Sequence, residues 1–315
     1  MIRKEGKQKV TSSATLECPP IESTPSRASI PGNLLRIDPE VFDSSFGRGP
    51  FVVGHRLTSH HLFEFARLLE LAKALPPASV EYNAGNLAVN QDPNLTPRNG
   101  LSAEETIDRI AHCNSWMVLK NVEQDVNYRD LLFRCLCEIE AQGHPYARGV
   151  CHREGFVFIS SPGAVTPYHV DTECNFLLQV AGKKQVSLFD GSDRSLLSEE
   201  ELERFYSGAH RNLVFKDNYQ HKASVFELRP GDGLHFPVTW PHWVKVHDEV
   251  SISFSITFRT RATERRDVLY HVNHYLRGKG WTPTPVGSSR LRDCLKYNAY
   301  RVVRRVHNLL KRDST

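Results

Sequence analysis

The spacing of apolar residues predicts a helix-rich first part of the chain. Apolar side chains recur every three or four residues in three segments that we expect to be helices: 59–75, 102–110 and 127–139. The first segment stops at a pair of prolines, and the second opens with Ser102 and Glu105 as a capping box. Residues 116–119 fit a short strand, whereas 82–100 is rich in Asn, Gly and Pro and is predicted to be a long loop.

After Val150 the pattern changes to short strands separated by turns. The runs that fit strands are 156–160, 175–180, 185–189, 224–228, 233–236, 243–246 and 252–258. Pro230-Gly231 fits the centre of a type II turn, and Ser198 with Glu201 predicts the start of one intervening helix. Many short strands with few helices between them favour an antiparallel sandwich or a small barrel such as a jelly roll. Helical spacing returns at 264–276 and 291–311.

These elements divide the 315 residues into four predicted segments. Residues 1–30 are rich in Ser, Thr, Pro and Lys, and we expect a disordered tail there. A helical and mixed region at 31–149 is expected to pack on a barrel at 150–262, and a helical extension at 263–315 is expected to follow. The predicted fold is therefore mainly β with flanking helices.

Composition narrows the function classes only a little. The net charge of +4 is small for a chain with 40 basic and 36 acidic residues, so it does not by itself indicate nucleic-acid binding. No apolar run is long enough to span a bilayer, and the basic first residues are not followed by the apolar core of a secretory signal. Seven cysteines without a C-x-x-C pair favour reduced thiols, so we expect a cytoplasmic protein.

The sharpest chemical signal is the pair His169 and Asp171. Residues two apart on a strand point to the same side, so both can face a barrel interior. Two such groups bind a divalent ion poorly, and the candidates for a third ligand are His242 and His235. His242 is preferred because tryptophans and a proline flank it, a rigid apolar setting that excludes water. Two imidazoles and one carboxylate on one side of a metal are typical of Fe(II) oxygenases.

Several motifs resemble those of one family. The T-P-Y-H-V-D run from Thr166, the N-F-x-x-Q-x-x-G run from Asn175 and the strand lysine Lys184 are similar to the core of the JmjC and cupin-like 2-oxoglutarate oxygenases. They are especially similar to the asparaginyl hydroxylase group that acts on hypoxia-inducible factor. The P-G-D run at 230–232, followed by Pro, Trp and the last histidine, resembles the family's second block. The resemblance covers about residues 157–259 and implies a double-stranded β-helix, the jelly roll of cupins.

The resemblance also implies a set of bound groups: Fe(II), the co-substrate 2-oxoglutarate and O₂. It implies the following residues: His169, Asp171 and His242 for the metal, and Lys184, Thr166, Asn175 and Thr257 for 2-oxoglutarate. Lys184 would pair with the distal carboxylate, because a dicarboxylate inside an apolar barrel needs a fixed cation. Lys183 instead fits a solvated hairpin lysine. Thr257 stands where the resembling hydroxylase has asparagine, and no catalytic residue beyond the metal ligands is expected.

The expected activity is hydroxylation of an unactivated C–H bond in an amino-acid side chain of a peptide or protein. A free small molecule is the alternative substrate, since a fold alone does not select one. A different class of function is a non-catalytic cupin-like barrel that acts as a binding module. The presence of all three implied metal ligands and of Lys184 favours the enzyme.

The last predicted helix, 291–311, is strongly basic. Its apolar residues recur at near-heptad spacing, while its other faces carry many Arg and Lys side chains and a single acid, Asp293. Three interpretations follow: a helix packed on the barrel with a solvated basic face, a helix that forms a homodimer, or a helix that contacts an anionic surface such as RNA or lipid. Nucleic acid is the least favoured of these partners.

Overall fold

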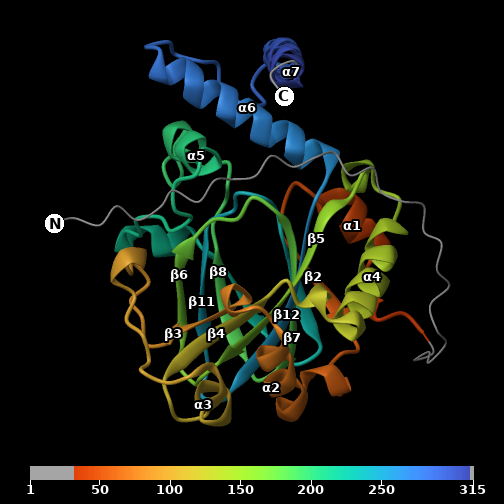
Figure 1. Cartoon of the computed structure of the whole chain (residues 1–315), viewed down its shortest axis with the longest axis vertical. Coiled ribbons are helices and arrows are strands. Elements are labelled where there is room, and N and C mark those ends of the chain that lie inside the picture. The colour runs from red at the N-terminus through yellow and green to blue at the C-terminus, as the bar shows by residue number, and fades with distance from the viewer. Residues whose placement is uncertain (1–31, 313–315) are drawn as a thin grey trace. The chain divides into compact units, whose positions relative to one another are not determined.

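The computed structural model describes residues 32–312 (Figure 1). The tail predicted at 1–30 lies outside the described residues. The larger of two sheets has the strand order β1-β2-β10-β7-β12-β5-β4-β3, and all its pairs are antiparallel. Its strands are β1 (Leu35–Arg36), β2 (Phe51–His55), β3 (Val80–Ala84), β4 (Ser115–Lys120), β5 (Cys151–Ser160), β7 (Cys174–Ala181), β10 (Asp232–Phe236) and β12 (Ser251–Arg259).

A smaller antiparallel sheet faces the larger one. Its order is β6-β11-β8-β9, and its strands are β6 (Val165–His169), β8 (Lys184–Leu188), β9 (Ser224–Leu228) and β11 (His242–Val246). Apolar side chains of both sheets pack together between them: Leu177, Leu234 and Phe236 from the larger sheet, and Val186, Leu188, Leu228 and Val244 from the smaller one. This antiparallel sandwich confirms the predicted jelly roll.

Helices cover the outer face of the larger sheet and one end of the sandwich (Figure 1). The helices are α1 (Pro39–Ser45), α2 (Phe65–Ala74), α3 (Ala103–Asp108), α4 (Val126–Glu140), α5 (Glu199–Tyr206), α6 (Arg261–Gly278) and α7 (Arg290–Arg312). Short 3₁₀ helices lie at His61–Phe63, Pro77–Ser79, Pro93–Leu95, Val122–Gln124, Pro145–Ala147 and Asp217–Lys222. Within the described part of the chain, no helix is both long and apolar enough to cross a bilayer.

Most predicted elements are present where the pattern placed them. Both predicted capping boxes form, at Ser102 with α3 and at Ser198 with α5. Gly231 has φ +98°, as the predicted turn requires. The prediction of a loop over 82–100 was wrong at its start, because β3 extends to Ala84 and pairs with β4. The sequence reading also missed β2, whose short apolar run adds to the edge of the larger sheet through β10.

The central strand β12 separates two environments. Its side chains alternate between small polar residues and large apolar residues from Ser251 to Phe258. The apolar set packs with the helices on the outer face: Ile252, Phe254, Ile256 and Phe258. The polar set faces the space between the sheets: Ser251, Ser253, Ser255 and Thr257. One strand thus contributes both to the hydrophobic core and to the wall of the interior.

Candidate metal centre

The structure brings His169, Asp171 and His242 together at one end of the smaller sheet. His169 is the last residue of β6 and lies opposite His242, the first residue of β11. The Oδ2 atom of Asp171 is 3.9 Å from His169 Nε2 and 3.7 Å from His242 Nε2. One ligand atom from each residue lies within 4.8 Å of the other two. Three donors from distant parts of the chain therefore converge on a single point.

Asp171 reaches this point by a different route from the one predicted. The strand β6 ends at His169, so alternation along a strand does not orient Asp171. Instead, the backbone N–H of Thr239 donates to the Asp171 carbonyl at 2.8 Å and ties the turn after β6 to the segment that leads into β11. Arg211 holds the carboxylate itself, with Nη1 3.3 Å from Oδ1. The expectation of a shared strand face was wrong, although the two side chains do converge.

Backbone carbonyls orient both imidazole rings. The Nδ1 atom of His169 lies 2.7 Å from the Pro167 carbonyl, and that of His242 lies 2.9 Å from the Trp240 carbonyl. A carbonyl oxygen only accepts hydrogen bonds, so each Nδ1 carries the proton and donates it. Each Nε2 is then unprotonated and carries a free lone pair near the Asp171 carboxylate. This arrangement is the usual support of histidine ligands in metal centres.

The protonation states of His169, Asp171 and His242 are those that favour binding of a cation. Burial, with the neighbouring His242 ring, lowers the pKa of His169, and burial likewise lowers the pKa of His242. Burial alone would raise the pKa of Asp171, but the adjacent His169 and the Arg211 guanidinium outweigh it and lower that pKa. At neutral pH the cluster therefore offers two neutral imidazoles and one carboxylate, the protonation states that a divalent metal requires.

The competing ligand His235 points to the opposite side of the larger sheet. Its ring packs between Phe46 and Phe51, with centroid distances of 4.9 Å to each. The register of β10 explains this, because Phe236, the next residue, faces the interior and contacts the His242 ring at 4.7 Å. The structure therefore separates His242, the ligand that the sequence analysis preferred, from its competitor His235.

Lys184 begins β8 and is 4% exposed. By alternation its side chain faces the interior with Val186 and Leu188. Among the described residues, no carboxylate lies within ion-pair distance of its ammonium, and burial lowers its pKa to about 7. Lys183, by contrast, has a side chain that is 54% exposed and lies 4.0 Å from Glu249. A buried cation without a protein partner is unfavourable unless a ligand supplies the negative charge.

Comparison with known protein families shows what the part of the chain around these residues is similar to. Residues 114–264 match the model of the cupin-like domain. This part of the chain is therefore similar to cupin-like domains. This stretch includes all three converging donors and Lys184, so these residues belong to the domain and not to the flanking helices.

Curated relatives match over the same kind of stretch. The chain is 32% identical over 118 residues to tRNA wybutosine-synthesizing protein 5 of Mus musculus, covering 35% of each chain. It is 32% identical over 102 residues to lysine-specific demethylase 8 of Danio rerio, covering 30% of this chain and 24% of the relative. It is 31% identical over 112 residues to HSPB1-associated protein 1 of Bos taurus, covering 33% of this chain and 23% of the relative. The chain thus spans about a quarter to a third of these relatives' length.

A solved structure shares the fold. The X-ray structure of Escherichia coli ycfD superposes with a TM-score of 0.51 at 17% identity, over 85% of this chain and 67% of that chain. At this level of identity the likeness concerns the fold alone. It agrees with the jelly-roll core of the cupin-like domain.

Thr166 is brought onto the interior side by a β-bulge. Thr166 lies opposite Val244 and His169 lies opposite His242, so three steps along β6 match two steps along β11. The extra residue lets Thr166 and His169 share a face, which regular alternation would forbid. Tyr168 lies between them and points outward, where its ring contacts Phe189 and Phe215 at 5.2 Å each.

The remaining predicted contacts, Asn175 and Thr257, lie opposite each other on β7 and β12. Asn175 is also in register with Phe236, the residue that contacts His242. The Asn175 Oδ1 atom accepts a hydrogen bond from the Ser255 hydroxyl at 2.8 Å, and the Thr257 hydroxyl donates to the Glu154 carbonyl at 3.3 Å. Both are therefore on the wall of the interior that faces His169, Asp171 and His242.

The sequence reading missed the supporting polar residues on this wall. Gln179 is fully buried, donates to the Ala181 and Gly182 carbonyls and accepts from the Ser253 hydroxyl at 2.6 Å. Arg211, which pairs with Asp171, was also missed. The signal for the wall was the strict alternation of Ser and Thr with apolar residues in β12, whereas nothing in the sequence near Arg211 connects it with Asp171.

Proposed function

We propose that this protein is an Fe(II)- and 2-oxoglutarate-dependent dioxygenase that hydroxylates an unactivated C–H bond. The observation that carries the proposal is the convergence of His169, Asp171 and His242 in a cupin-like domain whose interior also holds the unpaired cation of Lys184. The cluster of His169, Asp171 and His242 suits a metal ion, and Lys184 suits an anion. A dicarboxylate co-substrate that also chelates a metal would bind at both places.

The donor set fits Fe(II). Two neutral imidazoles and one carboxylate are a combination that leaves further coordination positions open for a co-substrate and O₂. His169, Asp171 and His242 would hold the ion. When bound, the ion and 2-oxoglutarate supply the oxidative chemistry that replaces a C–H bond by C–OH. The protein residues hold the ligands in their unprotonated forms and keep the surroundings dry, as the ring contact of Phe236 with His242 indicates.

The interior fits the co-substrate. The Lys184 ammonium would bind the distal carboxylate of 2-oxoglutarate, with the Thr166 hydroxyl as a further donor. Asn175 and Thr257 would lie near the end of 2-oxoglutarate at the metal. Lys184 and the position opposite His242 are four residues apart on β8, a strand length of about 13 Å. The long lysine side chain and an extended dicarboxylate together span a gap of this size.

The proposed substrate is an amino-acid side chain in a peptide or protein. Its support is the similarity to a relative named lysine-specific demethylase 8, whose name states action on lysine. A non-protein substrate is the second candidate, because another relative is named for tRNA wybutosine synthesis. Incubation with peptides and metabolites, followed by mass spectrometry for a gain of one oxygen atom, distinguishes the two.

The test of the activity is release of succinate from 2-oxoglutarate in the presence of Fe(II). His169→Ala and Asp171→Ala are each expected to abolish it, because two remaining ligands hold the ion poorly. Lys183→Ala is the matched control and should retain full turnover, since the Lys183 side chain is exposed. Full turnover in either ligand variant would reject the metal assignment. No succinate from the unaltered protein with any substrate would favour a non-catalytic binding module.

We further propose a cytoplasmic location and a homodimer formed through α7. The first is supported by the free thiols of the described cysteines, which suit a reducing compartment. The second is supported by apolar side chains that α7 exposes, among them Leu295 at 63% and Val302 at 60%. Light scattering measures the mass in solution: the unaltered protein should have the mass of a dimer and Leu295→Lys the mass of a monomer. A monomer mass for the unaltered protein would contradict the proposed dimer.

A further inference from the structure

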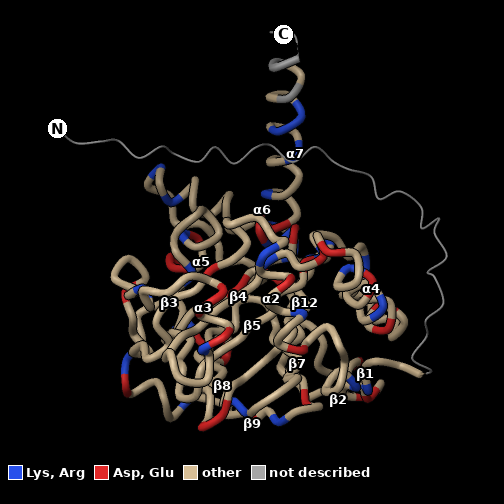
Figure 2. The backbone as a smooth tube through the Cα atoms, turned by 60° about the horizontal axis from the view of Figure 1, so that its bottom comes forward, with Lys and Arg blue, Asp and Glu red and all other residues tan. Residues whose placement is uncertain are grey.

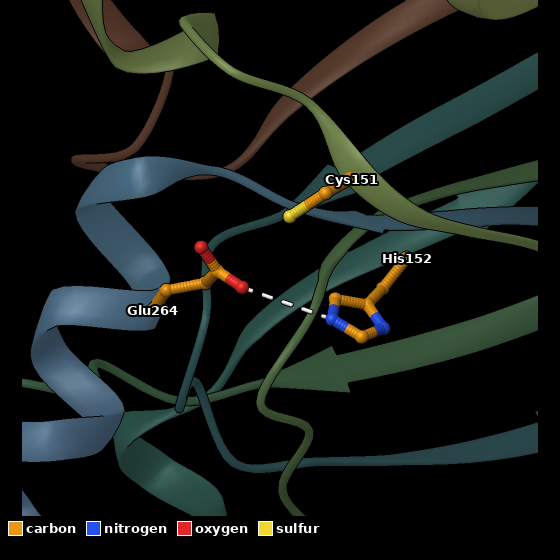
Figure 3. Close-up of side chains that lie close together, drawn as sticks. All are labelled: Cys151, His152 and Glu264. Atoms are coloured by element: carbon orange, nitrogen blue, oxygen red, sulfur yellow. Dashed lines mark ion pairs between the residues drawn. The ribbon is translucent and has the colours of Figure 1, made fainter. Parts of the chain in front are cut away.

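A second cluster of potential metal ligands lies apart from the first one. Cys151 and His152 open β5, and Glu264 lies in the first turn of α6. Figure 3 shows the three side chains pointing toward one another from these two elements. The Nε2 atom of His152 is 3.7 Å from Glu264 Oε1, and a ligand atom of each residue lies within 4.8 Å of the other two. None of the three belongs to the proposed iron centre.

The local backbone is irregular in a way that brings adjacent residues to one side. Consecutive residues of a regular strand point to opposite faces. Here Cys151 pairs with Arg259 while Glu154 pairs with Thr257, so β5 has an extra residue relative to β12. His152 has φ +47°, a left-handed conformation that is uncommon outside glycine. The bulge and the left-handed residue together direct the thiol and the imidazole toward the same carboxylate.

We infer that Cys151, His152 and Glu264 form a second cation site, which takes Zn²⁺ as a three-residue site with the fourth position open to water. Thiolate, imidazole and carboxylate are the three side-chain donors that Zn²⁺ uses in proteins. Two ligand atoms about 2.1 Å from one tetrahedral ion are about 3.4 Å apart. The 3.7 Å between His152 Nε2 and Glu264 Oε1 is a few tenths of an ångström longer, so small side-chain rotations suffice.

The donors of the cluster suit a cation, because the Glu264 carboxylate supplies a negative charge beside the Cys151 thiol and the His152 imidazole. Zinc displaces the thiol proton to solvent and binds the thiolate, so its affinity falls as the pH is lowered. The cluster is accessible, because the side chains of His152 and Glu264 are 51% and 47% exposed.

The location suggests a structural role for the ion. Cys151 and His152 lie at the start of β5, and Glu264 lies in the first turn of α6, the helix that leads from the sandwich toward α7. The backbone N–H of Arg261 already donates to the Arg148 carbonyl at 3.3 Å across this junction. A bound ion would add to the existing connections between the barrel and α6, which include the ion pair of Arg259 with Asp267 at 3.1 Å.

Titration of the full chain with Co²⁺ under a non-thiol reductant tests the site. A cobalt–thiolate charge-transfer band reports a sulfur ligand, which the proposed iron centre lacks. We expect the band to saturate at one cobalt per chain. Cys151→Ser should not show the band, and added Zn²⁺ should remove it by displacing cobalt. His152→Ala and Glu264→Gln should weaken cobalt binding by roughly tenfold or more, since each removes one of three ligands.

Two controls keep the result independent of the iron centre and of folding. Cys137→Ser removes an exposed thiol elsewhere and should leave the band intact, as should the double variant His169→Ala/Asp171→Ala. Zn²⁺ should raise the melting temperature of the double variant His169→Ala/Asp171→Ala. It should not raise the melting temperature of the triple variant that also carries Cys151→Ser. Absence of a thiolate band, or a band that survives Cys151→Ser, would overturn the inference whether or not the oxygenase activity is found.

Discussion

The two faces of the larger sheet show how one set of strands serves two purposes. On the outer face, β12 contributes large apolar side chains that pack with aromatic residues of the N-terminal helices, as Phe254 does with Phe63 at 5.6 Å. On the inner face, the same strand contributes three serine hydroxyls that are bonded to polar partners on β7 and one threonine hydroxyl that is bonded to β5. The outer face is a mainly apolar core that includes one buried imidazole, that of His235, whereas the inner face is a polar wall that leaves room for a ligand.

Loss of a large side chain on the outer face should have the largest effect on stability. Phe254 is fully buried, so Phe254→Ala is expected to lower the free energy of unfolding by about 3–5 kcal/mol. Urea denaturation followed by circular dichroism measures this change. A loss below 1 kcal/mol would mean that the two faces do not differ as described.

Loss of the interior cation should weaken co-substrate binding more than it affects folding. Lys184→Ala removes a charge-assisted contact worth roughly 1.5–3 kcal/mol, which corresponds to a 10- to 100-fold weaker affinity for 2-oxoglutarate. Calorimetric titration with 2-oxoglutarate measures the change. Lys183→Ala should bind as the unaltered protein does, and equal affinity in both variants would remove Lys184 from the proposed role.

The pH dependence of stability gives a further test of the difference between buried Lys184 and exposed Lys183. The folded-state pKa of Lys184 is about 7, below its ordinary value of 10.5, so between these values the unfolded chain holds one more proton. The free energy of unfolding should therefore rise with pH across this window, by at most about 1.4 kcal/mol per pH unit. Lys184→Met should lose this rise and should be more stable than the unaltered protein at pH 7. Lys183→Met, compared at pH 7 and pH 9, should keep the rise.

A polar substitution on the inner face should have the smallest effect on folding. Ser255→Ala removes the hydrogen bond to Asn175 and is expected to cost about 1 kcal/mol of stability or less. Its effect should appear instead as a higher KM for 2-oxoglutarate, because the Asn175 amide loses its support. If Ser255→Ala unfolds the protein as strongly as Phe254→Ala, the inner face is part of the core.

The sequence was informative where a local pattern has a local cause. Capping boxes, the turn at Gly231 and the period of β12 depend on neighbours in the chain, and these features were predictable. The preference for His242 over His235 rested on the rigid apolar residues beside His242, whereas the orientation of His235 depends on which face of β10 meets the smaller sheet, and no local pattern specifies that. The interior position of Thr166 depends on a bulge that no residue type marks. Arg211 meets Asp171 only through tertiary packing.

The division of ligands between the sheets also bears on how the protein loads. The three proposed metal ligands, Thr166 and Lys184 all come from the smaller sheet and the turn attached to it, whereas Asn175 and Thr257 come from the larger sheet. The proposed ion would therefore contact the smaller sheet and its turn alone, whereas the proposed co-substrate would contact residues of both sheets. Under the proposed function, 2-oxoglutarate would then enter and succinate would leave without release of the ion, so the metal would stay bound over many turnovers.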